Sequence, residues 1–343
     1  MKLVSYLAKD LEHLGLYIEN TIYNLSQNAF LIGKTLPDSM AAFLIEGEDA
    51  MKIAHQINDG IISNSFKAIA ASVDTASLLA PVPHPTSCRD GYAFRQHVEA
   101  ARRNRKVAMI PEFDQYPIFY FTNHNAIQGP GNIVCMPDHF QKLDFELEVS
   151  IVIGKKGRNI KAADADSYIA GFMIMNDMSA RTLQMEEMAL NLGPAKGKDF
   201  STVIGPWLVT PDELAPYKTS AKSGHVGNSY DLPMTCSVNG KIVSQGNMKE
   251  MDWTFAEIIE RCAYGVDILP GDVIGSGTVG TGCFLELNGT GLLNDPNYKT
   301  QWLQPNDVVE MDIKGLGHLS NTIRKDNSDF SILALKKVAL TTS

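Results

Sequence analysis

The sequence predicts an α+β protein that is built mainly of mixed β-sheets. Strand-like segments dominate from residue 110 onward, and few helical patterns are interleaved with them. A segment with prolines at alternate positions, Ala80–Thr86, favours an extended chain and cannot form a helix, so we place a domain junction there. We therefore expect a small N-terminal α+β domain at residues 1–79 and a larger domain at residues 80–343.

The composition is that of an ordinary globular protein, and it bounds the class of function. The hydrophobic content is 44% and the net charge is −9, which argues against a nucleic-acid-binding protein. The N-terminal segment Met1–Gly15 has no sustained apolar stretch, so we expect no signal peptide, and no apolar run approaches the roughly 20 residues that a membrane span needs. The cysteines are scattered without a C-x-x-C pair, which predicts a reduced, cytoplasmic protein.

The N-terminal region combines short strands with two helices. Glu19-Asn20 is a polar pair that suits a tight hairpin turn, and the segments on either side of it alternate apolar and polar residues. We therefore expect strands and helices, in that order, at Lys2–Tyr6, His13–Ile18, Thr21–Leu25, Asp38–Ile45 and Asp49–Ile57.

Two ionisable residues lie near the start of a predicted helix, Val98–Arg105. If that helix begins at Gly91, Asp90 caps it, and His97 follows two turns, or about 10 Å, along the same face. Each residue by itself has an ordinary structural interpretation, as a capping aspartate and as a histidine with a satisfied hydrogen bond. The spacing alone leaves both roles open.

An acidic strand is the most unusual feature of the chain. The segment Leu143–Gly154 alternates strictly from Asp144 to Val149, so one face carries Phe145, Leu147 and Val149 and the other carries Asp144, Glu146 and Glu148. Strands disfavour acidic residues, and like charges on one face repel. A solvated face explains the pattern, and so does a bound Mg²⁺, Ca²⁺ or Mn²⁺ ion, which oxygen ligands suit. On spacing alone the solvated face is the more common case.

Another acidic residue follows a buried strand in the middle of the chain. We expect a helix at Ala162–Ala170, a strand at Gly171–Asn176 and a second helix at Met178–Met188. Asp177 lies between the strand and the second helix. In its plain interpretation it caps that helix and pairs with Arg181, one turn away, and Gln184 lies on the same face.

Two glycine-rich segments resemble nucleotide-binding loops, and neither has the required context. In Gly193–Thr202 the pair Gly197-Lys198 is followed by Asp199, which breaks the phosphate-loop pattern. Gly275–Gly280 matches G-x-G-x-x-G, but that fingerprint must open a helix, whereas Gly282–Leu287 alternates as a strand. We expect a glycine-permitted bend that brings the backbone close to a ligand. Glu286, on the predicted strand, is either solvated or functional.

The remaining elements look structural. A hairpin turns at Asn239-Gly240, and Thr254–Glu257 is a capping box that opens an amphipathic helix, with Gly265 suited to its C-terminal end. An alternating strand lies within Pro305–Ile313, and Gly315–Asn321 closes the fold.

Several of these segments together resemble the motifs of the fumarylacetoacetate hydrolase family, in the order that the family has. The resemblance covers roughly residues 80–325, and the combination of the acidic strand with N-D-x-S-A-R and P-G-D…G-S-G-T makes it highly specific. The matching segments are Arg89–Tyr92 with Arg95–His97, Leu143–Glu148, Met175–Arg181, Gly197–Phe200, Leu269–Asp272 with Gly275–Thr278, and Gly315–Asn321.

The resemblance implies a fold and a cofactor. The fold is a mixed β-sheet sandwich or roll of the family's C-terminal type, preceded by the small N-terminal domain that many members carry. The cofactor is a divalent cation, usually Mg²⁺ or Ca²⁺ and in some cases Mn²⁺, held by Asp90, Glu146, Glu148 and Asp177. Metal binding then becomes the favoured explanation of the acidic strand, and Asp144 is left without a metal role. The family also implies a homodimer, by analogy alone.

The family's hydrolytic branch has a histidine base oriented by a glutamate, and His97 and Glu286 stand at the matching positions. Members without that histidine tend to be decarboxylases, isomerases or dehydratases. The resemblance further implies that Lys198 and Gln184 stabilise charge during catalysis. Residues matching positions that contact the substrate are Tyr92, Arg181, Gln184 and Thr278, and Thr202 matches a residue near a metal-bound water.

The chain departs from the fumarylacetoacetate enzymes where they bind the distal part of the substrate. Asn123 stands where a tyrosine is expected, Met188 and Ala189 occupy the region of a second tyrosine, and only Arg105 matches, loosely, an expected arginine. These changes leave the substrate open and the chemistry intact.

We therefore expect a metal-dependent hydrolase that cleaves a C–C bond in a 2,4-dioxo acid, with water activated by His97 and Glu286. Decarboxylation of oxaloacetate or keto–enol isomerisation on the same site is the first alternative, and dependence on His97 is expected to separate it from hydrolysis. A non-enzymatic Ca²⁺-stabilised β protein and a dinucleotide-binding module are further alternatives. The second of these requires a helix after Gly280.

Overall fold

The computed structural model describes residues 1–72 and 78–337, and the predicted α+β class is confirmed. Within these residues most strands belong to two sheets, one of ten strands and one of five, and three further sheets have two strands each. Both large sheets mix parallel and antiparallel pairs. In the first, β4 (Cys88–Gly91) runs parallel to β19 (Val273–Gly275), and in the second, β7 (Gly131–Cys135) runs parallel to β21 (Gly317–Lys325).

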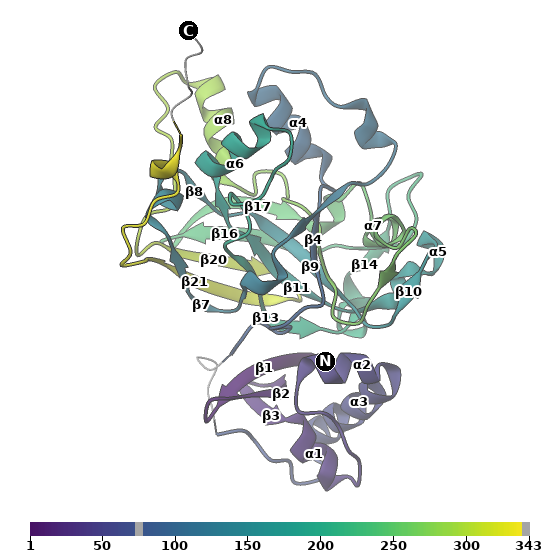
Figure 1. The fold of residues 1–343 in the computed structure, drawn as a ribbon. Coiled ribbons are helices and arrows are strands. Elements are labelled where there is room, and N and C mark those ends of the chain that lie inside the picture. Colours follow the sequence, from purple (N-terminus) through teal and green to yellow (C-terminus); the bar gives the residue numbers. More distant parts are fainter. Residues whose placement is uncertain (73–77, 338–343) are drawn as a thin grey trace.

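The N-terminal unit has the strands and the two helices that the sequence predicts, with shifted ends, and a third helix, Leu25–Leu31, that the sequence analysis missed. Glu19 and Asn20 have φ values of 46° and 64°, as a tight hairpin turn between twisted strands requires. In Figure 1 the unit lies below the rest of the molecule, in purple. Its elements are β1 (Lys2–Ala8), β2 (Leu11–Ile18), β3 (Thr21–Asn24), α1 (Leu25–Leu31), α2 (Met40–Glu46) and α3 (Glu48–Ile62).

The ten-stranded sheet runs from this unit into the larger part of the molecule. Lys2 and Leu3 in β1 pair with Val209 and Leu208 in β13, so hydrogen bonds join the two parts. The division of the chain at residues 79 and 80 stays a prediction. Beyond β1 the order is β13 (Thr202–Val209), β11 (Ile169–Asp177), β9 (Leu147–Ile153), β19 (Val273–Gly275), β4 (Cys88–Gly91) and β5 (Phe119–Thr122), and β6 (Ile127–Gln128) pairs with β13.

The five-stranded sheet packs against one face of the ten-stranded sheet. Phe145, Leu147 and Val149 point from the acidic strand into a core that also holds Met234 and Met311 of the second sheet, so the predicted inward face is confirmed. The order is β17 (Lys241–Asn247), β16 (Pro233–Val238), β20 (Val308–Ile313), β21 (Gly317–Lys325) and β7 (Gly131–Cys135).

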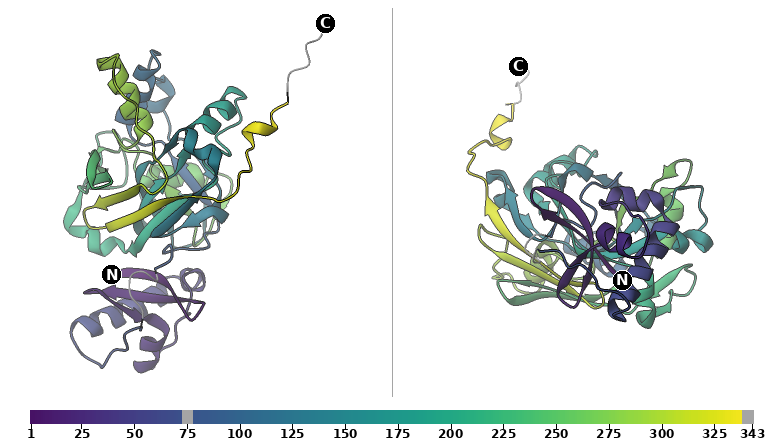
Figure 2. Two further views of the ribbon diagram at one scale, coloured as in Figure 1. Left: turned by 90° about the vertical axis from the view of Figure 1, so that its left-hand side faces the viewer. Right: turned by 90° about the horizontal axis from the view of Figure 1, so that it is seen from below.

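Helices cover the end of the larger part that lies away from the N-terminal unit. Figures 1 and 2 show α4, α6 and α8 together at that end. Among the described residues no helix is long and apolar enough to cross a membrane. The three helices at that end are α4 (Arg95–Asn104), α6 (Arg181–Ala189) and α8 (Phe284–Asn294), whereas α5 (Ala162–Ala165) and α7 (Phe255–Cys262) lie apart from them, near β10 in Figure 1.

Short elements complete the described chain. The two-stranded sheets join β8 (Leu143–Asp144) to β12 (Ser179–Ala180), β10 (Gly157–Arg158) to β18 (Asp267–Ile268), and β14 (Lys218–Ser220) to β15 (Asn228–Tyr230). The 3₁₀ turns are Pro111–Asp114, His124–Ala126, Pro137–Gln141, Asp166–Tyr168, Pro211–Tyr217, Met248–Glu250 and Leu333–Leu335. The predicted hairpin at Asn239-Gly240 and the capping box between Thr254 and Glu257 are confirmed.

The strand predicted at Gly282–Leu287 is wrong, because helix α8 begins at Phe284. The carboxylate of Asp144 accepts the backbone N–H groups of Phe284 and Leu285, at 2.7 and 2.9 Å. A carboxylate at a helix N-terminus stabilises the helix, since it satisfies unpaired N–H groups and complements the helix dipole. This contact joins residues 140 positions apart, so the local alternation of apolar residues could not indicate it.

The helices predicted at Val98–Arg105 and Met178–Met188 are present as α4 and α6, but the capping roles considered for Asp90 and Asp177 are wrong. Asp90 lies within β4, and α4 begins only at Arg95, so Asp90 caps no helix and does not share a helical face with His97. Asp177 ends β11, and α6 begins at Arg181 after the short strand β12. The helix predicted at Ala162–Ala170 is shorter than expected, because its last residues enter β11. Both aspartates are therefore free of local capping roles.

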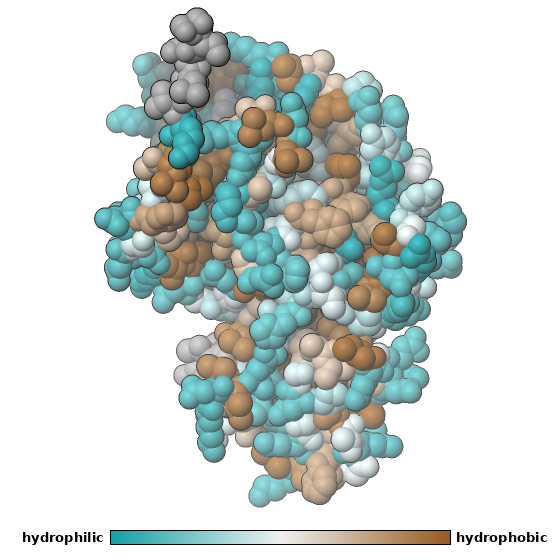
Figure 3. All heavy atoms as spheres, viewed as in Figure 1, coloured by the Kyte–Doolittle hydropathy of each residue, from teal (hydrophilic) through white to brown (hydrophobic). Residues whose placement is uncertain are grey.

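The surface mixes hydrophilic and hydrophobic residues in small patches on the face that Figure 3 shows. Several apolar side chains of α6 and the loop after it are exposed, among them Leu190 at 81% and Leu192 at 89%. The acidic strand, in contrast, is buried beneath this surface.

Candidate active site

Four carboxylates converge in the ten-stranded sheet, and three of them come from its strands β4, β9 and β11. Asp90 comes from β4, Glu148 from β9 and Asp177 from the end of β11, and Glu146 lies between β8 and β9. One oxygen atom of each lies within 4.8 Å of the others. The structure thus brings together the four residues that the family resemblance assigns to a metal.

Glycine makes room for this cluster. Gly275 is the β19 residue that pairs with Asp90 in β4. A Cβ atom on Gly275 would lie 2.3 Å from Asp90 Oδ1, so a side chain at that position would displace the carboxylate. The backbone N–H of Gly277 donates to the same oxygen at 3.0 Å. The glycine-rich segment Gly275–Gly280 therefore shapes the acidic cluster.

The prediction of a solvated acidic face, which strand spacing alone favoured, is wrong. Glu146 is 6% exposed, and Asp144 and Glu148 are fully buried. Burial and the neighbouring Asp177 raise the pKa of Asp90 to about 7, and burial likewise raises the pKa of Glu148 and of Asp177. Water therefore does not relieve the repulsion that the strand pattern indicates.

Two carboxylate oxygens in the cluster lack a hydrogen bond. Glu148 Oε2 and Asp177 Oδ1 are buried, and no residue that the structure describes donates to either. Buried charges without partners are costly. All the possible metal ligands in the cluster are carboxylate oxygens, which hard divalent cations prefer. The residues present therefore fit a divalent cation of the Mg²⁺, Ca²⁺ or Mn²⁺ type.

Two buried cations hold Glu146. Lys198 Nζ contacts Glu146 Oε2 and donates to Asp177 Oδ2 at 2.7 Å. Arg181 donates to Glu146 Oε1 at 2.8 Å. Although burial acts in the opposite direction, Lys198 and Arg181 hold the pKa of Glu146 well below its usual range. Glu146 is therefore charged and fixed in orientation.

Asp144 belongs to a different set of contacts. Its Oδ2 accepts Nε of Arg181 at 2.8 Å, and the same carboxylate caps helix α8. The Asp177–Arg181 pair expected from the sequence is wrong, because the guanidinium of Arg181 donates to Asp144, Gln184 and Glu146 instead. Arg181 thus connects the acidic strand to α6.

A histidine–glutamate pair lies beside the cluster. His97 Nδ1 lies 2.6 Å from Glu286 Oε2, and both side chains are buried. The other oxygen of Glu286 accepts the backbone N–H of Thr281 at 2.9 Å, which fixes the carboxylate. Since Glu286 accepts the proton on Nδ1, Nε2 is the lone-pair nitrogen of a neutral His97. A ring nitrogen of His97 and an oxygen of Glu146 lie within 4.8 Å.

The other predicted residues surround these groups. Thr278 Oγ1 donates to Glu148 Oε1 at 3.3 Å, and Gln184 Oε1 accepts Arg181 at 2.9 Å. The ring of Tyr92 meets the ring of His97 edge-on, with 6.0 Å between their centroids. Thr202 is buried in β13, where it pairs with Asp177.

Sequence reasoning missed Tyr120. Its hydroxyl donates to Asp177 Oδ2, and in the register of β4 and β5 it lies opposite Asp90. Asn123, which stands where the family has a tyrosine, instead donates to the carbonyl of Asp199 at 3.0 Å. In the sequence, Tyr120 is only one residue of a strand pattern, Phe119–Thr122. The pairing of β5 with β4 is what places its side chain near Asp90.

The two glycine-rich loops are filled by the protein itself. Glu187 accepts the backbone N–H groups of Ala195, Lys196 and Gly197, at 2.8, 2.6 and 3.1 Å, so a carboxylate takes the place that a phosphate would have. A helix does follow Gly280, contrary to expectation, but Asp144 occupies its N-terminus. These contacts argue against a nucleotide phosphate at either loop.

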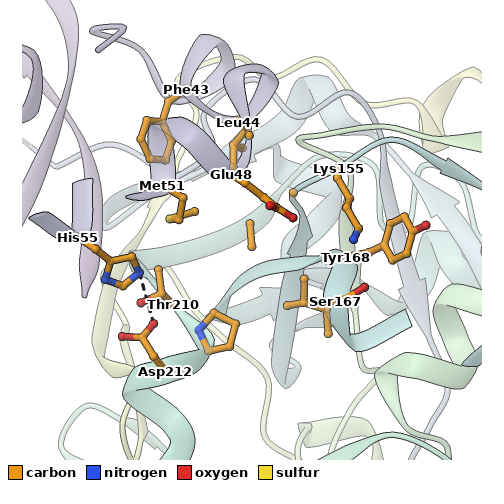
Figure 4. Close-up of a pocket in the computed structure, with 15 residues that line it drawn as sticks. Phe43, Leu44, Glu48, Met51, His55, Lys155, Ser167, Tyr168, Thr210 and Asp212 are labelled. Carbon is orange, nitrogen blue, oxygen red and sulfur yellow. Dashed lines mark ion pairs between the residues drawn. The ribbon is translucent and has the colours of Figure 1, made fainter. Parts of the chain in front are cut away.

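A separate pocket of about 140 Å³ lies between the N-terminal unit and the larger part (Figure 4). Figure 4 shows His55 beside Asp212 at one side and Lys155 beside Tyr168 at the other. None of the residues that line it belongs to the set predicted from the sequence. The pocket is therefore distinct from the carboxylate cluster.

The comparisons with known proteins decide the family. The family model described as fumarylacetoacetate (FAA) hydrolase C-terminal matches residues 86–324. The chain belongs to the fumarylacetoacetate hydrolase family. Its members include hydrolases and tautomerases, so this is a family of enzymes.

Curated relatives of the whole chain carry two kinds of name. The human protein named oxaloacetate tautomerase FAHD2A, mitochondrial, is 31% identical over 332 residues, which cover 94% of this chain and 91% of the relative. A Dictyostelium discoideum protein named fumarylacetoacetate hydrolase domain-containing protein 2 homolog is 28% identical, over 94% of this chain and 97% of the relative.

Solved structures show the same fold. A fumarylacetoacetate hydrolase from Exiguobacterium antarcticum has a TM-score of 0.66 at 22% identity, over 95% of this chain and all of that one. A maleylpyruvate hydrolase from Sphingobium has a TM-score of 0.65 at 19% identity, with the same coverage. The fold predicted from the family resemblance is confirmed.

Proposed function

We propose that the protein interconverts the keto and enol forms of a 2-oxo dicarboxylic acid such as oxaloacetate. The observation that carries the proposal is the buried contact of 2.6 Å between His97 and Glu286, beside four carboxylates that fit a divalent cation. The names of the relatives that are similar over more than nine-tenths of both chains support the choice of reaction.

His97 is the group that moves the proton. Glu286 accepts a hydrogen bond from the N–H at Nδ1 of His97. The lone pair on Nε2 is therefore available to take a proton from the carbon next to the 2-oxo group. Glu286 also stabilises the imidazolium that forms, because its carboxylate lies in direct contact with the ring. The proton then returns from Nε2 to the oxygen, which gives the enol with no bond between carbon atoms broken.

The carboxylates and their partners stabilise the charge that develops on the oxygen. Asp90, Glu146, Glu148 and Asp177 would hold a divalent cation, which when bound supplies positive charge to the developing enolate. Lys198 fixes Glu146 and Asp177 in position. His97 and Glu286 are 8% and 5% exposed, so little water competes for the proton.

The test is the decay of enol absorbance when the enol form of oxaloacetate is added to purified protein with Mg²⁺. We expect the protein to accelerate the approach to equilibrium, EDTA to abolish the acceleration, and His97→Gln to lower the rate by about 10²–10⁴-fold. His225→Gln is the matched control, because His225 pairs with Glu257 at 3.0 Å outside the site. An unchanged rate with His97→Gln would refute the role of His97.

Hydrolysis of a C–C bond in a 2,4-dioxo acid is the second candidate. The same His97–Glu286 pair favours it, since Nε2 can take a proton from water as well as from carbon. Dependence on His97, expected from the sequence to separate the reactions, therefore does not do so. The products separate the reactions. Hydrolysis of an acylpyruvate releases one equivalent of acid, and decarboxylation of oxaloacetate yields pyruvate. Tautomerisation yields neither product, but it exchanges the C3 protons of the substrate in D₂O.

A further inference from the structure

A buried thiol lies beside the histidine–glutamate pair, and the proposed reaction does not use it. Cys283 is fully buried at the N-cap of α8, where its sulfur accepts the backbone N–H of Glu286 at 3.5 Å. Its Sγ, a ring nitrogen of His97 and an oxygen of Glu146 all lie within 4.8 Å of one another. A thiol, an imidazole and a carboxylate, which are three different kinds of metal ligand, thus lie close together.

We propose that His97, Cys283 and Glu146 form a second cation site, selective for a thiophilic ion such as Zn²⁺, whose occupation inhibits the enzyme. It adjoins the carboxylate cluster and shares Glu146 with it, but it differs in chemistry. The carboxylate cluster offers oxygen only, which suits Mg²⁺ and Ca²⁺, whereas a thiolate and an imidazole select zinc-like ions over those hard ions.

The ligand set and its spacing match a zinc site that is open on one side. Zinc sites of this kind use three protein ligands and leave the fourth position to water or substrate. Metal–ligand distances of about 2.0–2.3 Å in a tetrahedron place ligand atoms roughly 3.3–3.8 Å apart. From separations of at most 4.8 Å, small side-chain rotations close the site.

The orientation of His97 supports the same conclusion. A histidine that binds a metal through one nitrogen commonly gives its other N–H to a carboxylate, which fixes the ring and strengthens the ligand. Glu286 holds Nδ1 of His97 at 2.6 Å, and the backbone N–H of Thr281 fixes Glu286 in turn. Nε2 is therefore the nitrogen presented to a metal, with its supporting carboxylate already in place.

The local charge also accommodates a second cation. Binding replaces the thiol proton of Cys283, which leaves to solvent, and it adds one net positive charge to the site. Only two cationic side chains, Lys198 and Arg181, contact the acidic groups within the described part of the site. Six buried carboxylates of the described chain belong to the two clusters or contact Arg181 or His97: Asp90, Asp144, Glu146, Glu148, Asp177 and Glu286.

Inhibition follows from the ligand assignment. A zinc ion on Nε2 of His97 occupies the lone pair that takes the substrate proton, so the bound enzyme cannot transfer it. Mg²⁺ at the carboxylate cluster leaves His97 and Cys283 available to zinc, because neither belongs to that cluster and Glu146 is the ligand that the two groups share.

The binding experiment uses Co²⁺ and Zn²⁺ with the full chain in the presence of saturating Mg²⁺. We expect Co²⁺ to give the intense near-ultraviolet band of a cobalt–thiolate bond, Zn²⁺ to remove it at one ion per chain, and Cys283→Ser to abolish it. Cys262→Ser is the matched control, since Cys262 is a buried cysteine in α7 that belongs to neither cluster of metal-ligating side chains in the described chain. The wild-type spectrum tests the site even if a variant folds poorly.

The inhibition experiment rests on the proposed function, whereas the binding experiment does not. Each variant is measured relative to its own rate without zinc, and we expect Cys283→Ser to raise the zinc concentration for half inhibition at least about 10-fold. A wild-type protein without a cobalt–thiolate band would overturn the proposal. Zinc inhibition that excess Mg²⁺ reverses equally in Cys283→Ser would also overturn it, because zinc then acts at the carboxylate cluster.

Discussion

The two ends of the acidic strand contain the same kind of side chain in opposite states. At the first end, Asp144 bonds Arg181 and two backbone N–H groups of α8. At the other end, Glu148 meets Asp90 and Asp177, and Glu148 Oε2 and Asp177 Oδ1 have no donor among the described residues. Burial alone therefore does not mark a metal site. What distinguishes the metal site is a buried carboxylate oxygen that receives no hydrogen bond from the described residues.

This difference assigns separate tasks to neighbouring carboxylates. Asp144 stabilises the fold, because it joins the acidic strand to α6 and α8 through charged hydrogen bonds. Asp90 and Glu148, which no lysine or arginine of the described residues contacts, cost stability until a cation binds them. Lys198, in contrast, already offsets part of the charge of Asp177. Variants at the two ends are expected to differ both in stability and in their response to metal.

The largest effect is expected for Glu148→Gln. Removing one of the unpaired carboxylates weakens cation binding, and the activity with Mg²⁺ should fall by roughly 10²–10³-fold, equal to about 3–4 kcal/mol of transition-state stabilisation. The metal-free variant should nevertheless melt at a higher temperature than the metal-free wild type, because the repulsion is smaller. Differential scanning calorimetry with and without Mg²⁺ checks this, and a metal-induced shift as large as in the wild type would contradict it.

The next largest effect is expected for Asp144→Asn. The change leaves Arg181 with less buried negative charge and weakens the cap of α8, and breaking a buried ion pair costs about 3–5 kcal/mol. Urea unfolding measures the loss. It should be the same with Mg²⁺ and with EDTA, in contrast to Glu148→Gln, and a loss confined to the metal-bound protein would place Asp144 at the metal.

A third prediction concerns the stability of the metal-free protein as pH changes. Burial raises the folded-state pKa of Asp90 from 3.8 to about 7, so folding favours the protonated carboxyl. Its contribution to stability is fully present below pH 3.8 and is lost as the pH rises through about 7. We expect the melting temperature in EDTA to fall by several degrees between pH 5 and about pH 7.5, and Mg²⁺ to remove most of that fall.

The smallest effect is expected for Glu187→Gln. Glu187 holds three backbone N–H groups of the loop that carries Lys198, but it does not touch the carboxylate cluster. Weaker support of Lys198 should lower kcat by about 3–10-fold while the melting temperature changes by less than in Asp144→Asn. Glu186→Gln is the neighbouring control on α6. Equal rates for Glu187→Gln and the wild type would show that the loop needs no such anchor.

The sequence was sufficient where the signal was local or combined several motifs. The hairpin at Glu19-Asn20 and the capping box at Thr254 depend on adjacent residues, so both were predicted. The four clustered carboxylates were predicted because the family motif specifies them together. The spacing of Asp144, Glu146 and Glu148 within the acidic strand favoured a solvated face. Only contacts with distant segments, through Arg181, Lys198 and α8, show that this face is buried.

The failures share one physical cause, which is contact between residues far apart in the sequence. The segment at Glu286 alternates like a strand, but Asp144 caps it as a helix. Tyr120 looks like an ordinary strand residue until β5 pairs with β4 and places its hydroxyl against Asp177. Arg181 has Asp177 one turn away in sequence, yet its partners are Asp144 and Glu146.

The distance along the chain between His97 and Glu286 has a consequence for folding. The two residues are 189 positions apart, and the pairing of β4 with β19 joins segments with a similar separation. Contacts of this range form late, because closing a long loop costs entropy before the contact repays it. During refolding, catalytic activity should therefore return after secondary structure and hydrophobic collapse. Recovered activity requires the contact between His97 and Glu286, so it indicates that both ends of the larger part have reached their native positions.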